Sequence, residues 1–325
     1  MPLPEVYLIG APKAGTTSLA RWMASRPDIY FSSLKEPVFW ASDYPRLRQL
    51  RGYDSRAAYE QLFSSSEARR ARVRAEGSTV YLYSRQAVPD IVQAVPTARF
   101  IVAVRNPVEL VLSFHRTQRL LLNENEPDFA AAWRRNLEGR PPAPGALDAK
   151  LLDYAMVGKQ GEAVARVLDV VPRDRMHFIV FDNLVRDPAA TWSALTGFLG
   201  VGAEPYPDFA VHNQSSRNFR FKRLQQLKER PPPMLRRMMR QVAAWSRSSR
   251  NPLVRKIKHR FWWRPERKPE ISPELQAELA AYFAADVRKL SAVLGTDLSG
   301  WTKKYRRSGD HINDVNRTRS LGQVG

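Results

Sequence analysis

Short apolar runs alternate along the chain with longer segments in which apolar residues recur at helical spacing. The short runs predict buried strands over residues 6–9, 29–31, 100–104 and 175–181. The periodic segments predict helices over residues 17–25, 129–137, 151–171, 188–199 and 272–295, and Pro107 suits the first turn of a further helix. Strands that alternate with helices in this way are typical of an α/β fold with a central parallel sheet.

The 325 residues can bury a full core, and we expect one domain over residues 1–302. Inside it, residues 214–270 predict a basic helical insertion or cap, and residues 303–325 predict a disordered basic tail. No signal-peptide pattern and no apolar run near the ~20 residues of a membrane-spanning helix is found, so we expect a cytoplasmic protein. Cysteine is absent from the sequence, which excludes disulfides, thiolate nucleophiles and zinc–cysteine sites.

The charge of the chain is strongly basic and unevenly spread. Lys and Arg number 52 against 32 Asp and Glu, a formal net charge of +20, and residues 214–270 hold 18 of these basic residues with three Glu. Residues 234–245 predict a basic amphipathic helix, and residues 259–265 interleave aromatic and basic side chains. Two interpretations stay open: the segment docks on the domain, or residues 234–268 contact a membrane surface or a polyanion. No nucleic-acid partner is expected.

The stretch from Gly10 to Ser18 joins the first predicted strand to the first predicted helix. Gly10 and Gly15 permit a sharp turn, so backbone N–H groups, hydroxyls and the Lys13 ammonium converge on a point that suits a phosphate or sulfate. A P-loop of the NTPase kind would have lysine where this chain has Thr16. The loop therefore serves magnesium and a γ-phosphate poorly, and Lys13 would reach instead toward the bridging oxygen of a nucleotide's terminal group.

An arginine at the end of the strand over residues 100–104 marks a second candidate anion site. Arg105 follows that strand, and Ser113 lies two turns into the helix that begins at Pro107. A guanidinium can bind one phosphate through two hydrogen bonds, and a hydroxyl can add a third. The Lys13 loop lies some 90 residues upstream. The sequence therefore predicts two separate phosphate-binding sites for one nucleotide.

The tripeptide Lys35-Glu36-Pro37 follows the loop by about 20 residues, across one predicted helix and one predicted strand. In a βαβ unit this returns the chain to the C-terminal edge of the sheet, where α/β proteins bind their ligands, so Glu36 can face the loop. The alternative is a surface Lys–Glu pair before a proline turn, and the pattern alone leaves both interpretations open.

Together these segments resemble the sulfotransferases that use 3′-phosphoadenosine 5′-phosphosulfate (PAPS), as bacterial members similar to the heparan sulfate and carbohydrate sulfotransferase domain. The resemblance extends from Tyr7 to Trp301 and is strongest at the two phosphate segments. It implies an α/β, P-loop nucleotide-kinase-like sulfotransferase fold, with a central parallel β-sheet flanked by helices. It also implies PAPS as the cosubstrate, adenosine 3′,5′-bisphosphate as the product, and no metal ion.

The resemblance also implies roles for individual residues. Glu36 is the expected general base, and Lys13 is expected to neutralise charge on the leaving oxygen, so both are candidate catalytic residues. The loop is expected to hold the 5′-phosphosulfate, and Arg105 with Ser113 the 3′-phosphate. The expected PAPS-binding residues are Lys13, Ala14, Gly15, Thr16, Thr17, Ser18, Arg105, Ser113, Phe219, Arg267 and Lys268, the last three standing for a late segment that closes over the nucleotide.

Two further residues, Ser78 and Tyr81, belong to a stretch that lines the cleft in this family and are additional candidates. We expect the protein to transfer a sulfuryl group to a hydroxyl or amine, and the acceptor is a saccharide, a lipid-linked molecule or a small natural product. Two alternatives from other classes are a P-loop-type kinase and a non-catalytic polyanion-binding protein. The first should have lysine in place of Thr16, and the second does not explain the paired phosphate segments.

Overall fold

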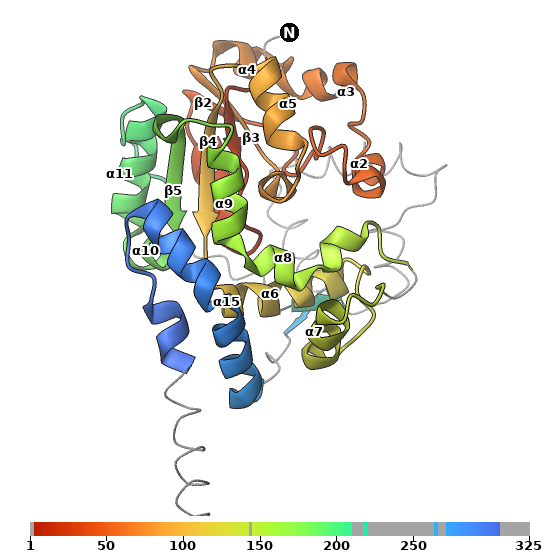
Figure 1. The fold of residues 1–325 in the computed structure, drawn as a ribbon. Helices are drawn as coiled ribbons and strands as arrows, with labels where there is room; N and C mark the ends of the chain where they lie inside the picture. Colours follow the sequence, from red (N-terminus) through yellow and green to blue (C-terminus); the bar gives the residue numbers. More distant parts are fainter. Residues whose placement is uncertain (1–2, 143–144, 210–216, 220–262, 266–270, 306–325) are drawn as a thin grey trace, which may run out of the picture.

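The computed structural model describes residues 3–142, 145–209, 217–219, 263–265 and 271–305. In these residues, the centre of the molecule is a five-stranded sheet with the strand order β2-β3-β1-β4-β5 (Figure 1). Every neighbouring pair of its strands is parallel. The strands are β1 (Val6–Leu8), β2 (Ile29–Phe31), β3 (Val73–Gly77), β4 (Arg99–Val104) and β5 (Met176–Val180). The prediction of an α/β fold with a central parallel sheet is therefore confirmed.

The strands at the centre of the sheet are buried because helices cover both faces. All of β1 is buried, and β4 is buried from its second residue to its end, as expected of apolar runs in a parallel sheet. The register pairs Leu8 with Gly77 of β3 and with Ile101 of β4. The segments that follow β1, β3 and β4 therefore leave the sheet along one edge, where ligand sites of parallel sheets form.

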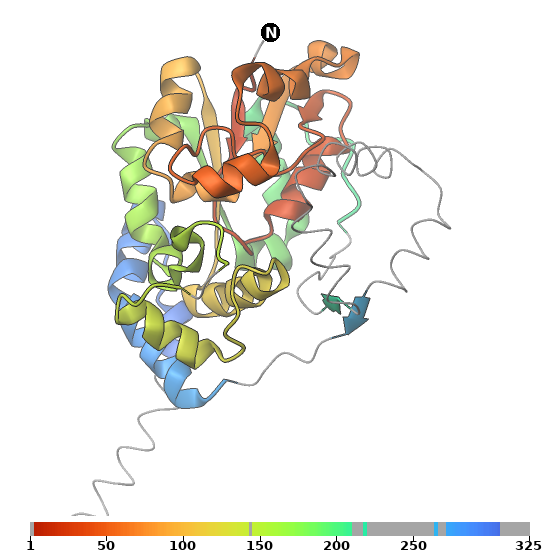
Figure 2. The ribbon, with the colours of Figure 1, turned by 90° about the vertical axis from the view of Figure 1, so that its right-hand side faces the viewer.

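Helices lie on both faces of the sheet and across its C-terminal edge. In Figures 1 and 2, α5 and α9 lie over one face and α1 over the other, while α6, α7 and α8 lie beyond the end of β4. The long helix α15 contacts α9 and α6. The bounds are α1 Thr16–Ala24, α5 Ala87–Ala94, α6 Pro107–Leu120, α7 Phe129–Leu137, α8 Tyr154–Gly158, α9 Gln160–Leu168, α10 Phe181–Arg186, α11 Pro188–Leu199 and α15 Pro273–Leu294.

Several helix ends follow directly from local sequence. Pro107 is the first residue of α6, and the Asn106 side chain caps this helix by accepting a hydrogen bond from the Val108 N–H at 3.0 Å. The start of α15 is similar, because the Ser272 hydroxyl accepts a bond from the Leu275 N–H at 3.2 Å. These starts, and the end of α11 at Gly200, agree with the sequence prediction.

One predicted helix is wrong. Residues 151–171 form the 3₁₀ turn η3 (Ala149–Leu152) and then α8 and α9, which are separated by the non-helical Lys159. The Gln160 side chain accepts a bond from the Arg105 N–H at 2.9 Å and donates one to the Arg105 carbonyl at 2.6 Å. These bonds hold the non-helical residue between α8 and α9 against the end of β4. Because the bonded residues are far apart in the sequence, no local sequence pattern predicts this interruption of the helix.

The region between β2 and β3 folds as short helices rather than one long one. Their bounds are α2 Pro45–Arg51, α3 Arg56–Glu60, η1 Gln61–Phe63 and α4 Ser66–Arg70. Directly after β3 comes the 3₁₀ turn η2 (Thr79–Leu82). The polar and arginine-rich sequence of this region gives each helix only a narrow buried face, Leu47 in α2 and Tyr59 in α3.

The structure describes only part of the predicted basic segment and part of the predicted tail. In the basic segment 214–270, β6 (Arg217–Phe219) pairs antiparallel with β7 (Trp263–Pro265), and the predicted helix over 234–245 lies outside the described residues. Residues 303–305, expected to belong to the tail, are part of a final helical segment over 300–305. In the described part of the chain, no helix has the length and apolar character needed to cross a membrane.

Candidate active site

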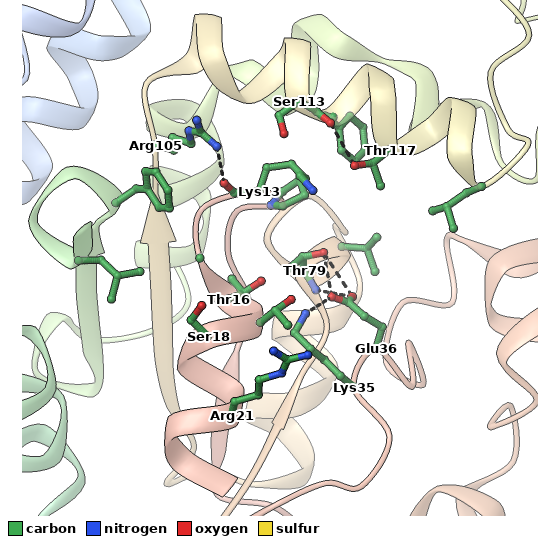
Figure 3. A pocket seen from close by; sticks show the side chains of 18 of the residues that line it. Lys13, Thr16, Ser18, Arg21, Lys35, Glu36, Thr79, Arg105, Ser113 and Thr117 are labelled. Atoms are coloured by element: carbon green, nitrogen blue, oxygen red, sulfur yellow. Dashed lines mark hydrogen bonds and ion pairs between the residues drawn. The ribbon is translucent and has the colours of Figure 1, made fainter. Parts of the chain in front are cut away.

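A cavity of about 460 Å³ lies at the C-terminal edge of the sheet, between the β1–α1 loop, the segment after β2, η2 and helix α6 (Figure 3). It brings together eight of the residues that the sequence predicted for the site. They are Lys13, Gly15, Thr16, Thr17, Ser18, Glu36, Arg105 and Ser113. Segments about 90 residues apart in the sequence therefore face the same space, because parallel strands end at the same edge.

The β1–α1 loop extends the sheet and then turns sharply. The Ile9 N–H donates to the Ile101 carbonyl at 2.9 Å, so the chain stays beside β4 beyond the end of β1. Lys13 and Gly15 then have positive φ angles of 66° and 84°. A side chain at position 15 would collide with Leu184, since a Cβ there would lie 2.3 Å from its Cδ2. The turn thus requires glycine at this position.

No described side chain caps the N-terminus of α1. An anion can take that place because the first amides of a helix lack partners inside the helix. Two amides are used by the loop itself, since the Ala14 N–H donates to the Ala11 carbonyl and the Ser18 N–H to the Gly15 carbonyl. Ala14 is fully buried and does not line the cavity. We therefore expect the amides of residues 15–17, rather than that of Ala14, to meet a bound anion.

Lys13 is held in an environment that disfavours its own charge. Burial, together with the nearby cations Arg105, Arg116 and Lys35, lowers the pKa of Lys13 to about 8. Such a cluster of positive charges is relieved when an anion enters. The electrostatics of the cavity therefore fit a ligand with several negative charges.

Arg105 is fixed in place on three sides. Its guanidinium donates to the Lys13 carbonyl at 3.0 Å, pairs with the Glu109 carboxylate at 2.9 Å, and lies 4.4 Å from the centre of the Phe181 ring. Figure 3 shows this side chain at the end of β4 beside the Lys13 loop. The orientation of the guanidinium toward the cavity is thus set before any ligand binds.

Ser113 lies on α6 with its side chain toward the cavity. The Ser113 Oγ is buried and has no hydrogen-bond partner among the described residues, while its backbone carbonyl accepts from the Thr117 hydroxyl at 3.0 Å. A buried hydroxyl without a partner costs about 1–3 kcal/mol. Since Ser113 and Arg105 line the same cavity, an oxyanion between them would remove this cost, which is the fit expected for a phosphate.

Glu36 is held at the edge of the cavity by the backbone of β3 and η2. Its N–H donates to the Gly77 carbonyl at 2.8 Å, and its φ angle is 66°. The carboxylate accepts bonds from the Lys35 ammonium at 2.6 Å and from the Thr79 N–H at 2.8 Å (Figure 3). One-fifth of the Glu36 side chain, 20%, is exposed. The group is therefore firmly positioned yet reachable.

The charge state of Glu36 suits the acceptance of a proton. Burial alone would raise the pKa of this carboxyl, but the Lys35 and Arg51 charges and the Thr79 N–H hold the pKa below its ordinary value. Glu36 is thus ionised at neutral pH, as a general base must be. This role of Lys35 was not predicted from its place in the tripeptide.

Six other polar residues of the cavity were not predicted from the sequence. They are Arg21, Arg51, Thr79, Thr117, Gln118 and Asn123. Arg21 lies one helical turn after Ser18, so the helical period of α1 could have found it. No local sequence pattern identifies Thr79 or Arg51 as residues of the cavity. Their places depend on how η2 and α2 pack against Glu36.

Ser78 and Tyr81 do not belong to the cavity, which corrects the expectation that they line it. Both are fully buried. The Ser78 hydroxyl accepts from the Val38 N–H at 3.1 Å and donates to the buried Glu76 at 3.2 Å, and the Tyr81 hydroxyl accepts from the Trp40 N–H at 3.3 Å. They fix the backbone around Glu36 rather than contact a ligand.

The late closing segment is not tested by the structure. Phe219 is the last residue of β6, and its side chain is not described. Arg267 and Lys268 lie outside the described residues. Their expected contacts with the nucleotide stay predictions. In the described residues, no group of three His, Cys, Asp or Glu side chains is placed to hold a metal ion.

Comparison with known proteins gives the class of the protein. A family model of the sulfotransferase domain matches residues 3–293. Since this is most of the chain, the protein belongs to the sulfotransferase domain family, and the resemblance inferred from the sequence is confirmed.

Two curated relatives match part of the chain. Heparan sulfate glucosamine 3-O-sulfotransferase 3B1 of Mus musculus is 26% identical over 199 residues, which are 61% of this chain and 46% of the relative. Heparan sulfate glucosamine 3-O-sulfotransferase 6 of Homo sapiens is 26% identical over 198 residues, 61% of this chain and 52% of the relative. The matched part of the chain thus spans about half the length of these relatives.

The solved structure of a sulfotransferase from Alicyclobacillus acidocaldarius has a similar fold. It superposes with a TM-score of 0.67 and 24% sequence identity, covering 93% of this chain and 99% of that chain. At this identity the likeness supports the fold, and the predicted sulfotransferase fold is confirmed.

Proposed function

We propose that the protein transfers a sulfuryl group from PAPS to a hydroxyl or amine of an acceptor and releases adenosine 3′,5′-bisphosphate. The observation that carries this proposal is the buried Ser113 hydroxyl, which has no partner among the described residues and lines the same cavity as Arg105. This observation supports a second anion site in the cavity, apart from the Lys13 loop. PAPS has two phosphate positions, whereas the nucleotide of an ordinary kinase has a single polyphosphate chain.

The residues of the cavity divide between the two ends of such a nucleotide. Lys13, the N-terminus of α1 and the hydroxyls of Thr16, Thr17 and Ser18 would hold the 5′-phosphosulfate. Arg105 and Ser113 would hold the 3′-phosphate, the first through a charged pair and the second through one hydrogen bond. PAPS supplies the activated sulfuryl group, and these side chains supply its position and the balance of charge.

Glu36 and Lys13 would act on the two oxygens of the transfer. Glu36 accepts the proton of the acceptor hydroxyl while the hydroxyl oxygen forms a bond to sulfur. The bond between sulfur and the bridging oxygen breaks, and the negative charge that develops on that oxygen is stabilised by the Lys13 ammonium. Charge stabilisation by groups fixed in advance is the main source of catalysis in transfers of this kind.

The acceptor, the location and the domain plan are proposals as well. The relatives act, by their names, on heparan sulfate, which makes a saccharide one candidate acceptor. A peripheral contact of residues 234–268 with a membrane or polyanion would fit the excess of positive charge there. We also propose that residues 1–302 form one domain in a cytoplasmic protein.

Calorimetry with adenosine 3′,5′-bisphosphate, beside ADP with magnesium, tests the proposal and its two rivals. We expect the bisphosphate to bind tightly without metal and Arg105→Ala to weaken it by about 1.5–3 kcal/mol, the usual worth of a hydrogen bond to a charged group. Arg140→Ala is the matched control, because Arg140 is exposed and pairs only with the exposed Glu138 in the described residues.

Two results would contradict the proposal. Preference for ADP with magnesium would favour a kinase. Failure to bind either nucleotide, together with salt-dependent binding of any polyanion, would favour a non-catalytic binder.

A further inference from the structure

Besides the residues already described, a group of five aliphatic side chains lines the cavity. They come from the segment after β2, from α2, from η2, from the C-terminal end of α6 and from η3. These residues are Val38, Leu47, Val80, Leu121 and Leu151. Thr117, Gln118 and Asn123 add polar groups to the cavity, and Arg51 adds a cation.

Helix α6 shows that this apolar region is separate from the 3′-phosphate site. Ser113, Thr117 and Leu121 are spaced one helical turn apart and all line the cavity. At 1.5 Å per residue, Leu121 lies about 12 Å along the helix from Ser113. In Figure 3, α6 runs from the Arg105 side of the cavity past Ser113 to Thr117, above Thr79 and Glu36. The helix therefore leads from the nucleotide end of the cavity to the apolar end.

The walls of this region are tied together by polar contacts outside the cavity. The Leu47 N–H donates to Asp148 at 2.8 Å, which joins α2 to the chain just before η3. The Lys150 ammonium pairs with Asp43 at 2.7 Å. These bonds link segments about 100 residues apart, so the apolar wall is a fixed surface.

Backbone strain lies at the same place. Glu36 and Val38 have positive φ angles of 66° and 61° on either side of Pro37. Residues other than glycine rarely adopt this conformation, and such strain gathers at functional sites. Here it places a carboxylate and an apolar side chain on the wall of one cavity.

Arg51 is a cation on the wall of this cavity that can bind a ligand. Arg51 lies one turn after Leu47 on α2 and lines the cavity, and its buried Nε has no hydrogen-bond partner among the described residues. The amides of Gln118 and Asn123 also line the cavity, and the Asn123 side chain donates to the Gln118 side-chain oxygen at 2.8 Å. Arg51 is thus the guanidinium best placed to receive an acceptor group beside Glu36.

Resting on the proposed sulfotransferase function, we infer that the acceptor is a small amphiphilic alcohol or phenol whose apolar body contacts the wall of Val38, Leu47 and Leu121 and whose carboxylate pairs with Arg51. Contact with these side chains favours such a ligand, because its apolar surface leaves water. A polysaccharide would instead place several hydroxyls against apolar side chains, and each hydroxyl without a partner is costly. The hydroxyl of the amphiphile lies at Glu36 and receives the sulfuryl group.

The test compares three probes with PAPS as donor: 3-(4-hydroxyphenyl)propanoate, its methyl ester and a heparosan oligosaccharide. We expect the acid to have the highest kcat/KM and the ester to react about tenfold to a hundredfold less well, the range for one hydrogen bond to a charged group. Arg51→Ala should reduce kcat/KM for the acid to that of the ester and leave the ester nearly unchanged. The ester also reports any change that Arg51→Ala makes to Glu36, since both probes use that base.

Two further variants separate a recognition role from damage to the fold. Arg46→Ala removes an exposed arginine from the same helix α2, and we expect no change with any probe. Leu121→Asn places a polar group on the apolar wall, and kcat/KM should fall for acid and ester alike. Each variant should bind adenosine 3′,5′-bisphosphate as the wild type does.

Several results would overturn the inference. These are faster sulfation of the oligosaccharide, equal reaction of acid and ester in the wild type, or equal loss of both in Arg51→Ala. A protein that binds the bisphosphate but sulfates neither small probe would overturn it as well. Failure to bind the bisphosphate would instead contradict the proposed function itself, so the two failures are distinguishable.

Discussion

The Lys13 ammonium lies near other positively charged side chains, which disfavour its protonated form. Burial, with Arg105, Arg116 and Lys35, lowers the pKa of Lys13 to about 8. A lysine near this value is still mostly charged at neutral pH, and its charge is poorly compensated until an anion arrives. The affinity of the cavity for a nucleotide should therefore depend on a proton that the free protein loses near pH 8.

We expect the affinity for adenosine 3′,5′-bisphosphate to fall as pH rises through about 8. The sign follows because the protonated lysine binds the anion, so above pH 8 binding must take up a proton. Calorimetry at several pH values, in buffers of different ionisation enthalpy, measures both the affinity and this uptake. In Lys13→Met the affinity should be lower and this decline absent. An unchanged pH profile in Lys13→Met would contradict the assignment.

At the scale of elements, helix starts were predictable and the break between α8 and α9 was not. Pro107 with the Asn106 cap is a signal contained in neighbouring residues. The break at Lys159 depends on Gln160, which bonds the Arg105 backbone, and on Asp286 of α15, which accepts from the N–H groups of Gly161 and Glu162, each at 2.7 Å. Partners more than 50 residues away leave no pattern in a local window.

The same distinction applies to the site. The sequence predicted Lys13, Arg105 and Ser113 because each lies in a motif whose strand and helix fix its direction. It could not assign Arg51 or Thr79, since their positions beside Glu36 arise from the packing of α2 and η2 at the sheet edge. Ser78 was misplaced for a related reason. A strand-to-loop pattern does not tell a side chain that faces the cavity from one that bonds the backbone beneath it.

Asp286 should contribute strongly to stability, because it caps α9 from another helix. Asp286→Ala leaves two amides at the start of α9 without their acceptor, and we expect the free energy of unfolding to fall by about 1–3 kcal/mol. Urea denaturation measures this change. The matched control is Asp297→Ala, which removes an exposed carboxylate that also accepts two bonds, both from Ser299, and it should cost less. Equal effects of the two variants would contradict the role given to Asp286.

At the scale of the whole molecule, the parallel sheet brings the two phosphate segments and Glu36 to one edge. That architecture could be predicted from alternating strands and helices, although the strand order β2-β3-β1-β4-β5 could not. The formal charge of +20 attracts anions of any kind. Affinity for a charged nucleotide therefore does not by itself establish the site, and a comparison between two nucleotides at constant ionic strength does.

The most direct measurement compares adenosine 3′,5′-bisphosphate with adenosine 5′-monophosphate on the wild type and on Ser113→Ala. We expect the wild type to prefer the bisphosphate, and Ser113→Ala to weaken the bisphosphate by about tenfold or more while the monophosphate changes little. Stability should not fall, because the Ser113 Oγ has no partner to lose among the described residues. Equal affinity of the wild type for both nucleotides, or equal weakening of both by Ser113→Ala, would contradict a 3′-phosphate site and with it the proposed use of PAPS.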